Sequence, residues 1–228
     1  MRRVAFSNGE YYHIFNRGVD KRITFLDTRD YERFLYLVFA CNDVQPLLNS
    51  QFYYRGLTSI ETYPRKREPI VDIISFCVMP NHFHFLLHER TENGISRFMQ
   101  KLGTGYTMYF NTRYKRSGAL FQGTFKSRHI DPEAYLLHIA TYIHLNPVGI
   151  SPESFRVQNG KDTYEHVQRY PWSSYTAFIG ESPFDVLLNK KLITELYPEP
   201  KEYKRWIKEW VMRGPPDTDW NIEKYILE

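Results

Sequence analysis

Cysteine and long apolar runs are both scarce in this sequence. Its 228 residues include only two cysteines, Cys41 and Cys77, and neither has a second Cys or His at a spacing typical of structural zinc. We therefore expect two buried thiols in a reducing compartment rather than a disulfide framework. No run approaches the roughly 18 apolar residues of a membrane-spanning helix, and no apolar stretch of a secretion signal follows Met1-Arg2-Arg3. These absences predict a cytoplasmic protein.

The chain also lacks internal repeats, low-complexity segments and a phosphate-binding P-loop. Its hydrophobic content of 42% and charged content of 25% are ordinary for a globular protein, and its length allows one domain of about 100–200 residues plus an appendage. We predict a first domain over residues 1–150 and a mostly helical C-terminal extension over 151–228, with helices near 184–197 and 201–213.

Acidic residues are absent from residues 97–128, where basic side chains alternate with aromatic rings. Cations that neutralise phosphates, together with rings that stack on bases, suit a single-stranded or distorted nucleic acid. A solvated helix face above core aromatics would give the same composition. We expect the nucleic-acid contacts to come from Arg97, Lys101, Arg113, Lys115, Arg116, Lys126 and Arg128, together with Arg17 near the N-terminus.

Hydrophobic periodicity and turn residues predict alternating strands and helices up to residue 147. Strands are expected over 10–17, 70–79, 82–88 and 119–130, with Pro80-Asn81 as a hairpin turn. Helices are expected after Asp27 or Thr28, from Asn93 or Ser96 to about Arg113, and from Asp131-Pro132 to Asn146-Pro147. The order predicts an α+β protein with a ferredoxin-like antiparallel sheet (βαββαβ), a following helix and the helical extension. Residues 45–69 are expected to form a long loop.

Two histidines of the third predicted strand, His82 and His84, flank Phe83. Because successive side chains of a strand point to opposite faces, the two imidazoles share one face and are placed to bind one cation. His88 is too far away to complete that site, about 13 Å from His84 at about 3.3 Å per residue. Surface histidines on a solvated strand face would show the same spacing, so this pair alone does not establish a metal site.

The last predicted helix of the first domain carries a narrow stripe of reactive side chains beside a broad apolar face. Tyr142 and Asn146 are four residues apart and are therefore neighbours on the helix surface. An Asn oxygen is an acceptable third ligand for a hard cation such as Mg²⁺. The spacing leaves two alternatives open. Tyr135 lies close to Tyr142 on the helical wheel, and Asn146 could serve only to end the helix before Pro147.

Five segments in order along the chain resemble one known family. They are Tyr11-Tyr-His-Ile-Phe-Asn-Arg-Gly18, Val78-Met-Pro-Asn-His-Phe-His-Phe-Leu-Leu87, Gly118-Ala-Leu-Phe-Gln-Gly-Thr-Phe-Lys-Ser127, Tyr142-Ile-His-Leu-Asn-Pro-Val148 and Tyr170-Pro-Trp-Ser-Ser-Tyr175. Together they resemble the single-tyrosine HUH (Y1) transposases, and most closely the REP-associated tyrosine transposases. The connection over 45–69 is longer than the family pattern, and the tail after about residue 180 matches no motif.

The resemblance implies a role for each site residue. His82 and His84 match the metal-binding histidines. Tyr142 matches the nucleophile, and Asn146 matches the residue that completes the site for Mg²⁺ or Mn²⁺. Such enzymes act on single-stranded DNA that folds into hairpins, and attack by the tyrosine leaves a 5′-phosphotyrosine and a free 3′-hydroxyl. The chain is therefore expected to be a metal-dependent single-stranded DNA endonuclease and strand-transferase. The resemblance does not identify a proton acceptor for Tyr142, and His138 is a candidate because it lies one helical turn earlier.

Two rival functions fit part of the same pattern. A catalytically idle regulator derived from a transposase would bind hairpin DNA without cutting it, but such a binder has no need of four intact site residues. A replication initiator or relaxase would use the same chemistry, but it would be expected to carry a helicase or a long accessory region, for which we find no room. Among the assemblies of the family we favour a monomer over a homodimer, associated with the nucleoid when bound to DNA.

Overall fold

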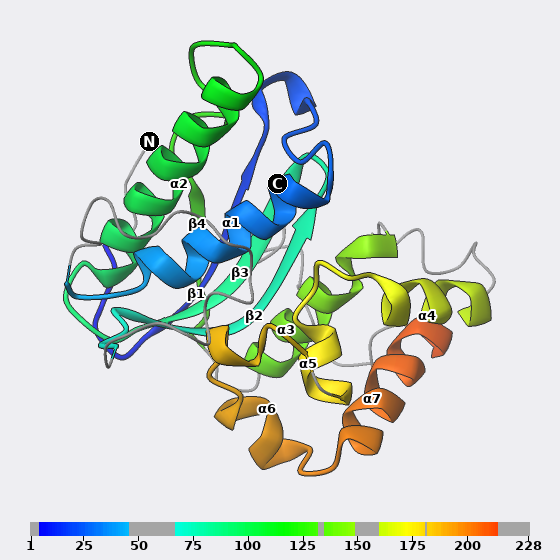
Figure 1. Ribbon diagram of the computed structural model, residues 1–228. Helices are drawn as coiled ribbons and strands as arrows, with labels where there is room; N and C mark the ends of the chain where they lie inside the picture. The colour runs from blue at the N-terminus through cyan, green and yellow to red at the C-terminus, as the bar shows by residue number, and fades with distance from the viewer. Residues whose placement is uncertain (1–4, 46–66, 132–134, 149–159, 181, 214–228) are drawn as a thin grey trace.

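The computed structural model describes residues 5–45, 67–131, 135–148, 160–180 and 182–213 (Figure 1). Within these residues, a four-stranded antiparallel sheet has the strand order β2-β3-β1-β4. Its strands are β1 (Tyr11–Arg17), β2 (Val71–Met79), β3 (His82–Glu89) and β4 (Lys126–His129). Helix α1 (Thr28–Cys41) lies between β1 and β2 in the chain, and α2 (Gly94–Arg113) lies between β3 and β4. The predicted ferredoxin-like βαββαβ arrangement is confirmed.

Most predicted boundaries of the strands and helices up to Arg113 are also confirmed. Helix α1 follows Asp27, whose side chain accepts a hydrogen bond from the backbone N–H of Asp30 at 3.3 Å. This bond satisfies one of the donors that the first helical turn leaves unpaired. Both cysteines are free and buried, as expected. Most of the predicted loop over 45–69 lies outside the described residues.

The predicted fourth strand is too long. Strand β4 covers only Lys126–His129 rather than 119–130. The chain turns at Gly118 and Gly123, whose φ angles of +85° and +74° favour glycine and interrupt an extended strand. Between these turns, an isolated bridge joins Gly18 to Phe121.

Two predicted helices also differ from the structure. Helix α3 (Leu136–Leu145) has Tyr135 as its N-cap rather than Asp131, and residues 132–134 lie outside the described part of the chain. It ends as predicted, with a 3₁₀ turn over Asn146–Val148. The helix expected over 184–197 is reduced to a 3₁₀ turn and α6 (Lys191–Leu196).

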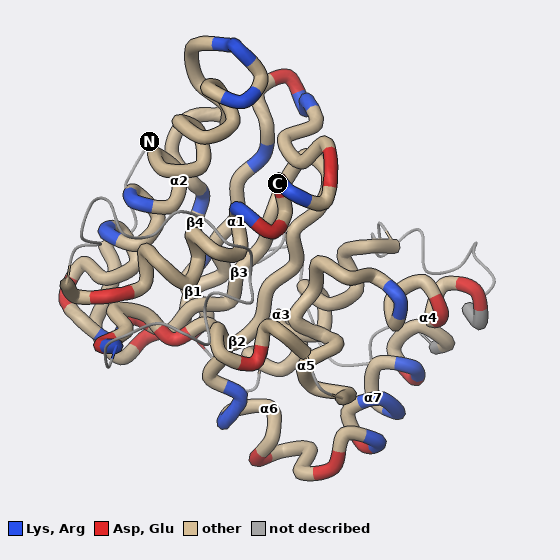
Figure 2. The backbone as a smooth tube through the Cα atoms, in the orientation of Figure 1, with Lys and Arg blue, Asp and Glu red and all other residues tan. Residues whose placement is uncertain are grey.

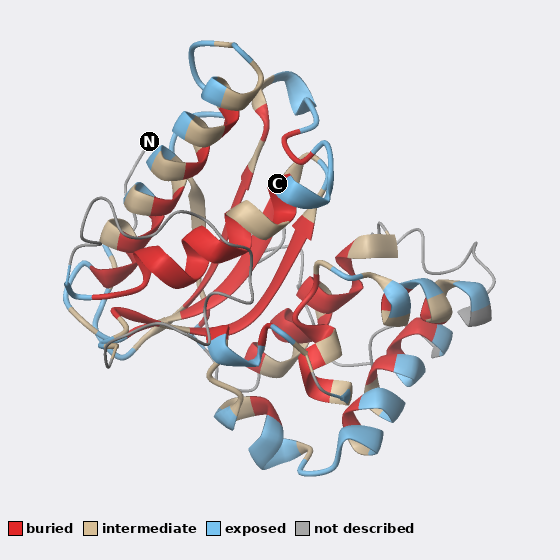
Figure 3. Cartoon of the chain, in the orientation of Figure 1, coloured by how far each residue is buried: buried red, intermediate tan, exposed pale blue. Residues whose placement is uncertain are grey.

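Buried hydrophobic side chains form two clusters, one on each face of the sheet. Figure 3 marks most of the sheet and of α1 as buried. Helices α1 and α2 cover the first face, where Phe83 and Phe85 of β3 pack. Helix α3 packs against β2 and β3 on the second face, which carries Leu86. Since successive side chains of a strand point to opposite faces, the even-numbered positions of β3 face the α3 side.

The remaining helices extend the second cluster. They are α4 (Gly160–Arg169), α5 (Tyr175–Ile179), α6 and α7 (Pro200–Arg213). Helix α7 packs against α4 and α5, and its Tyr203 and Ile207 share the cluster with Ile139 and Ile143 of α3. The predicted helix over 201–213 is thus confirmed. Within the described segments, no helix combines the length and the apolar character needed to cross a membrane.

Residues 170–175 line the outer edge of the sheet at β2. The backbone N–H of Val78 donates to the carbonyl oxygen of Trp172 at 2.9 Å. In return, the backbone N–H of Ser174 donates to the carbonyl oxygen of Phe76 at 3.0 Å. The tyrosine hydroxyl of Tyr170 donates to the carbonyl oxygen of Val78 at 2.7 Å. This pairing covers an edge strand, which would otherwise present unpaired backbone groups to other chains. The segment also attaches the C-terminal helices to the sheet.

Candidate active site

The two histidines of β3 lie on the α3 side of the sheet, as strand alternation predicts. Across the β1–β3 pairing, Arg17 is opposite His82 and Phe15 is opposite His84. The His84 side chain is fully buried. The half-buried His82 lies with Nδ1 2.6 Å from Oδ1 of Asn81. The two imidazole centroids are 5.1 Å apart with their planes at 86°, so the rings are close but face different directions.

Helix α3 brings Tyr142 to this pair. Its buried side chains Leu136, Ile139, Ala140 and Ile143 recur at helical spacing and pack against the sheet. Tyr142 lies beside this apolar face and is half-buried. Its ring is perpendicular to that of His84, with centroids 5.8 Å apart. The structure therefore brings Tyr142 and His84 together from two separate elements.

Asn146 follows Tyr142 by one turn and is 8% exposed. Its side-chain Nδ2 donates to the carbonyl oxygen of Tyr142 at 3.2 Å, which directs the amide oxygen Oδ1 elsewhere. Two imidazole nitrogens and one amide oxygen form a donor set that suits Mn²⁺ or Mg²⁺ with water and substrate oxygen completing the shell. Among the residues that the structure describes, no three His, Cys, Asp or Glu side chains gather as one metal site. The predicted ligand set is of a different type, because its third member is an amide.

A third histidine joins the site, and the sequence did not single it out. His13 of β1 is fully buried, and its Nε2 lies 2.9 Å from Nδ1 of His84. Its ring also lies 6.0 Å from that of Tyr142 at 80°. Alternation along β1 puts His13 on the same face as Phe15 and Arg17. Only the register between β1 and β3 brings that face next to His84.

Three of the predicted DNA-contacting cations share this face of the sheet. Arg17 is paired with His82, and the β1–β4 register puts Lys126 opposite Phe15 and Arg128 opposite His13. Residues directly opposite each other in an antiparallel pair lie on the same face. Lys126 Nζ lies 5.7 Å from the Phe15 ring centroid. The face thus combines the histidines with three cations and an aromatic ring.

The other five predicted cations lie on α2 and the loop that follows it (Figure 2). Lys101 Nζ donates to the carbonyl oxygen of Asp43 at 3.1 Å. Arg116 donates to Oδ1 of Asn111 and to the carbonyl oxygen of Ala119. Arg97 is half-buried and Lys115 is exposed. These residues lie on the helical layer that covers the opposite face of the sheet, so the basic stretch does not form one surface.

Arg113 is bound within the fold. It donates from Nη1 to Oδ1 of the fully buried Asp30 at 2.6 Å and from Nη2 to Oδ2 of Asp27 at 2.5 Å. The hydrogen bond from Arg113 also lowers the pKa of the Asp27 carboxyl below its usual value. The hydroxyl of Tyr109 donates to Asp30 in the same cluster. Arg113 therefore ties the end of α2 to the beginning of α1.

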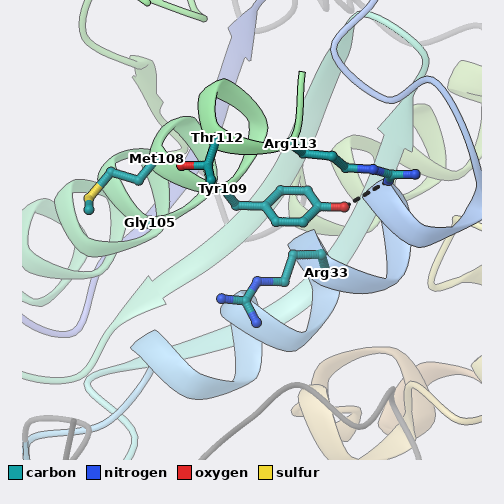
Figure 4. A pocket seen from close by; sticks show the side chains of 6 residues that line it. All are labelled: Arg33, Gly105, Met108, Tyr109, Thr112 and Arg113. Carbon is teal, nitrogen blue, oxygen red and sulfur yellow. Dashed lines mark hydrogen bonds between the residues drawn. The ribbon is translucent and has the colours of Figure 1, made fainter. Parts of the chain in front are cut away.

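A groove on the α1–α2 layer lies beside this cluster. Its lining comes from Arg33, Gly105, Met108, Tyr109, Thr112 and Arg113 (Figure 4). Of the predicted site residues it contains only Arg113, whose guanidinium donates to the hydroxyl of Tyr109 at 2.8 Å. The histidines and Tyr142 belong to the other face of the sheet.

The candidate proton acceptor His138 contacts the C-terminal helices. Its ring centroid lies 5.5 Å from those of Trp206 and Trp210 of α7, and burial lowers its pKa to about 4. A histidine with so low a pKa is a weak base at neutral pH. The structure gives His138 a packing role and does not support it as the base. Tyr135, the alternative nucleophile, is the N-cap of α3, two turns before Tyr142.

Comparisons with known proteins identify a family and a related fold. The family model described as "Transposase IS200 like" matches residues 32–146, just over half of the chain. The match includes His82, His84, Tyr142 and Asn146. A solved REP-associated tyrosine transposase, bound to a REP hairpin, shares the fold with a TM-score of 0.50 at 15% sequence identity. The similarity covers 83% of this chain and 90% of that one. No curated protein sequence matches.

Proposed function

Because the chain belongs to the IS200-like transposase family, we propose that it is a metal-dependent nuclease and strand-transferase for single-stranded DNA. Tyr142 is the nucleophile of this proposal, and His82, His84 and Asn146 hold the cation. The observation that carries it is the perpendicular contact of the Tyr142 and His84 rings, which come from separate elements. Basic side chains lie on the same face of the sheet as the two histidines. If Tyr142 and these histidines served only for packing, they would not need such neighbours.

The donor set supports the choice of cation. His82 and His84 supply imidazole nitrogens and Asn146 supplies an amide oxygen, a combination that accepts Mn²⁺ or Mg²⁺. When bound, such a cation polarises a phosphate oxygen and stabilises the charge that develops in the transition state. The protein's own contribution is to align the attacking and leaving oxygens.

The reaction follows from the nucleophile. The Tyr142 hydroxyl oxygen attacks the phosphorus of a DNA phosphodiester, and the bond from phosphorus to the 3′ oxygen breaks. The proton that the tyrosine loses is balanced by the proton that the leaving 3′ oxygen takes up. One product is a 5′-phosphotyrosine, and the other ends in a 3′-hydroxyl. Because a phosphodiester bond is kept, a 3′-hydroxyl can attack the phosphotyrosine and rejoin two strands without ATP. One nucleophile processes one strand at a time.

The substrate in this proposal is DNA that folds into hairpins, as in a REP-associated transposase. Arg17, Lys126 and Arg128 supply phosphate contacts on the histidine face, and Phe15 lies under Lys126. Phosphate contacts give affinity and register rather than sequence reading. The structural relative is itself bound to a REP hairpin, which supports this substrate class. The order of the five motifs supports the REP-associated branch of the family.

Cleavage of labelled hairpin DNA tests the proposal. With Mn²⁺ present, the wild-type protein should convert 3′-labelled DNA into a protein–DNA adduct and 5′-labelled DNA into a shorter free fragment. Tyr142→Phe should lower both products by at least about 10³-fold, the scale seen when a nucleophile is removed. Tyr135→Phe is the matched control and should cleave like wild type. A chelator should abolish cleavage until Mn²⁺ is restored.

The idle-regulator alternative has its own outcome in this assay. If the wild-type protein and Tyr142→Phe both bind the hairpin and neither cuts it, the nuclease proposal fails. If instead Tyr135→Phe loses the adduct and Tyr142→Phe keeps it, the assignment of the nucleophile fails while the reaction stands.

A further inference from the structure

His13 is a buried side chain at the site, and the proposed reaction gives it no role. We propose that His13 is a positioning residue for the metal ligand His84, held through a hydrogen bond between their rings so that Nε2 of His84 faces the cation. This inference rests on the metal site of the proposed function. It adds a specific tautomer for each ring and a specific ligating atom.

The contact between the two rings has the geometry of a hydrogen bond. Nε2 of His13 and Nδ1 of His84 are 2.9 Å apart, and the ring planes differ by only 18°. The centroids are 5.1 Å apart, close to the largest separation that this nitrogen contact allows. The two nitrogens therefore lie near the line that joins the centroids. If both nitrogens were directed at one cation, the rings would converge on it and their centroids would be closer together.

The strand register places His13 on the far side of His84 from His82. Along the β1–β3 pairing, His82 is opposite Arg17, His84 is opposite Phe15, and His13 is opposite Leu86. A cation shared by His82 and His84 would lie on the His82 side of the His84 ring. His13 meets the other side of that ring, through Nδ1.

This arrangement decides which atoms carry protons. A neutral histidine that binds a metal through Nε2 keeps its proton on Nδ1 and donates it to an outer partner. Here the partner is Nε2 of His13, which accepts only if the proton of that ring is on Nδ1. His13 thus orients the His84 ring in the way that a carboxylate or carbonyl oxygen orients other metal-binding histidines.

The surroundings of His13 make it a rigid support. Its side chain is fully buried, and its strand is paired on both sides, with Leu86 opposite on β3 and Arg128 opposite on β4. Its ring also contacts Phe15, with centroids 5.0 Å apart. A His13 ring held in this way fixes the orientation of the His84 ring. The Tyr142 ring lies perpendicular to the rings of His13 and His84 and contacts both.

The affinity for Mn²⁺ without DNA tests this role. We would titrate the protein with Mn²⁺ and follow the free ion by electron paramagnetic resonance. His13→Phe keeps a ring but loses the acceptor, so the dissociation constant should rise by about 10–100-fold. His13→Gln offers an amide oxygen to Nδ1–H of His84 and should recover part of that loss. His129→Phe removes another sheet histidine, which is bonded to Glu10, and should bind Mn²⁺ like wild type.

Nitrogen chemical shifts of the wild-type protein give a second readout that a merely space-filling role would not produce. The metal-free protein should show protons on Nδ1 of both His84 and His13. A proton on Nε2 of His84 would overturn the inference, even if His13→Phe failed to fold. Unchanged Mn²⁺ affinity in a folded His13→Phe would also overturn it while leaving the metal site intact. If wild type itself bound no Mn²⁺, the proposed metal site would fail together with this inference.

Discussion

The ring of Tyr142 stands at 90° to the ring of His84, with 5.8 Å between their centroids. Tyr142 belongs to α3 and His84 to β3, so their relative position depends on how α3 is attached to the sheet. Polar contacts attach the helix in addition to its apolar face, among them the 2.8 Å contact between His144 and the hydroxyl of Tyr203 of α7. His144 lies 2.7 Å from the hydroxyl of Ser174 beside β2, and Trp206 of α7 donates to Oγ1 of Thr141 at 2.9 Å. These contacts make the C-terminal helices part of the support of the site.

Ser174→Ala is expected to loosen α3 against β2. The Ser174 hydroxyl contacts buried His144 and accepts a hydrogen bond from the N–H of Phe76 at 2.8 Å. Leaving such buried groups unsatisfied costs about 1–3 kcal/mol, so the free energy of unfolding in urea should fall by that amount. Cleavage should slow as Tyr142 becomes less well placed. Thr194→Ala on the exposed face of α6 is the control, and an equal loss in both variants would contradict the role of Ser174.

Mild acid should destabilise the contact between α3 and α7. Burial lowers the pKa of His138 to about 4, whereas an unfolded histidine titrates near 6.5. Between these values the unfolded chain binds the extra proton, so stability contributed by neutral His138 is complete above about pH 6.5 and is lost as the pH falls towards 4. One such group gives a slope of at most about 1.4 kcal/mol per pH unit.

Unfolding free energies of wild type and His138→Leu between pH 7 and pH 5 measure this contribution. The variant keeps an apolar contact with Trp206 and Trp210 and should have a shallower pH dependence than wild type. Identical slopes in the two proteins would show that His138 does not titrate as its burial indicates.

The cluster around Asp30 should be important for stability and not for DNA binding. The buried carboxylate accepts hydrogen bonds from Arg113, from the hydroxyls of Tyr109 and Tyr114, and from the N–H of Leu26. Asp30→Ala leaves the Arg113 charge without its buried partner and should cost about 3–5 kcal/mol in denaturant unfolding.

Asp27→Ala is the matched control for this cluster, because the Asp27 side chain also binds Arg113 but is 50% exposed. It should cost about 1 kcal/mol, the usual effect of losing a helix N-cap. A cost for Asp30→Ala no larger than this would contradict the structural role assigned to the cluster.

Removal of Lys126 and Arg128 should weaken DNA binding at all sequences to a similar extent. Both lie on the histidine face by their register with β1. The plot of log affinity against log salt concentration has a negative slope, and each lost phosphate contact should make this slope less steep by about one. Fluorescence anisotropy of a labelled hairpin at several salt concentrations measures both effects. The control removes the same charge from exposed Lys204 and Lys208 of α7, and an equal change there would show that only total charge matters.

Features that depend on spacing within one element could be predicted from the sequence. Strand alternation predicted that His82 and His84 share a face. Their rings lie 5.1 Å apart, and the contact of His84 with Tyr142 shows that this face is the α3 side. Helical spacing predicted that Asn146 is one turn from Tyr142, and the 3.2 Å hydrogen bond between them agrees. The fourth strand was predicted too long because β-prone residues lie on both sides of Gly123. The positive φ of this glycine interrupts the extended chain, so the strand begins only after it.

The sequence by itself determined the order of strands and helices, the shared face of the two histidines, and the tyrosine helix, because each follows from a local period of two or 3.6 residues. Only the tertiary structure decided which partners meet these residues. It placed His13 against His84, separated Lys126 and Arg128 from the cations of α2, and joined residues 170–175 to β2. The physical reason is that strand register and helix docking depend on contacts between distant segments, which local periodicity does not encode.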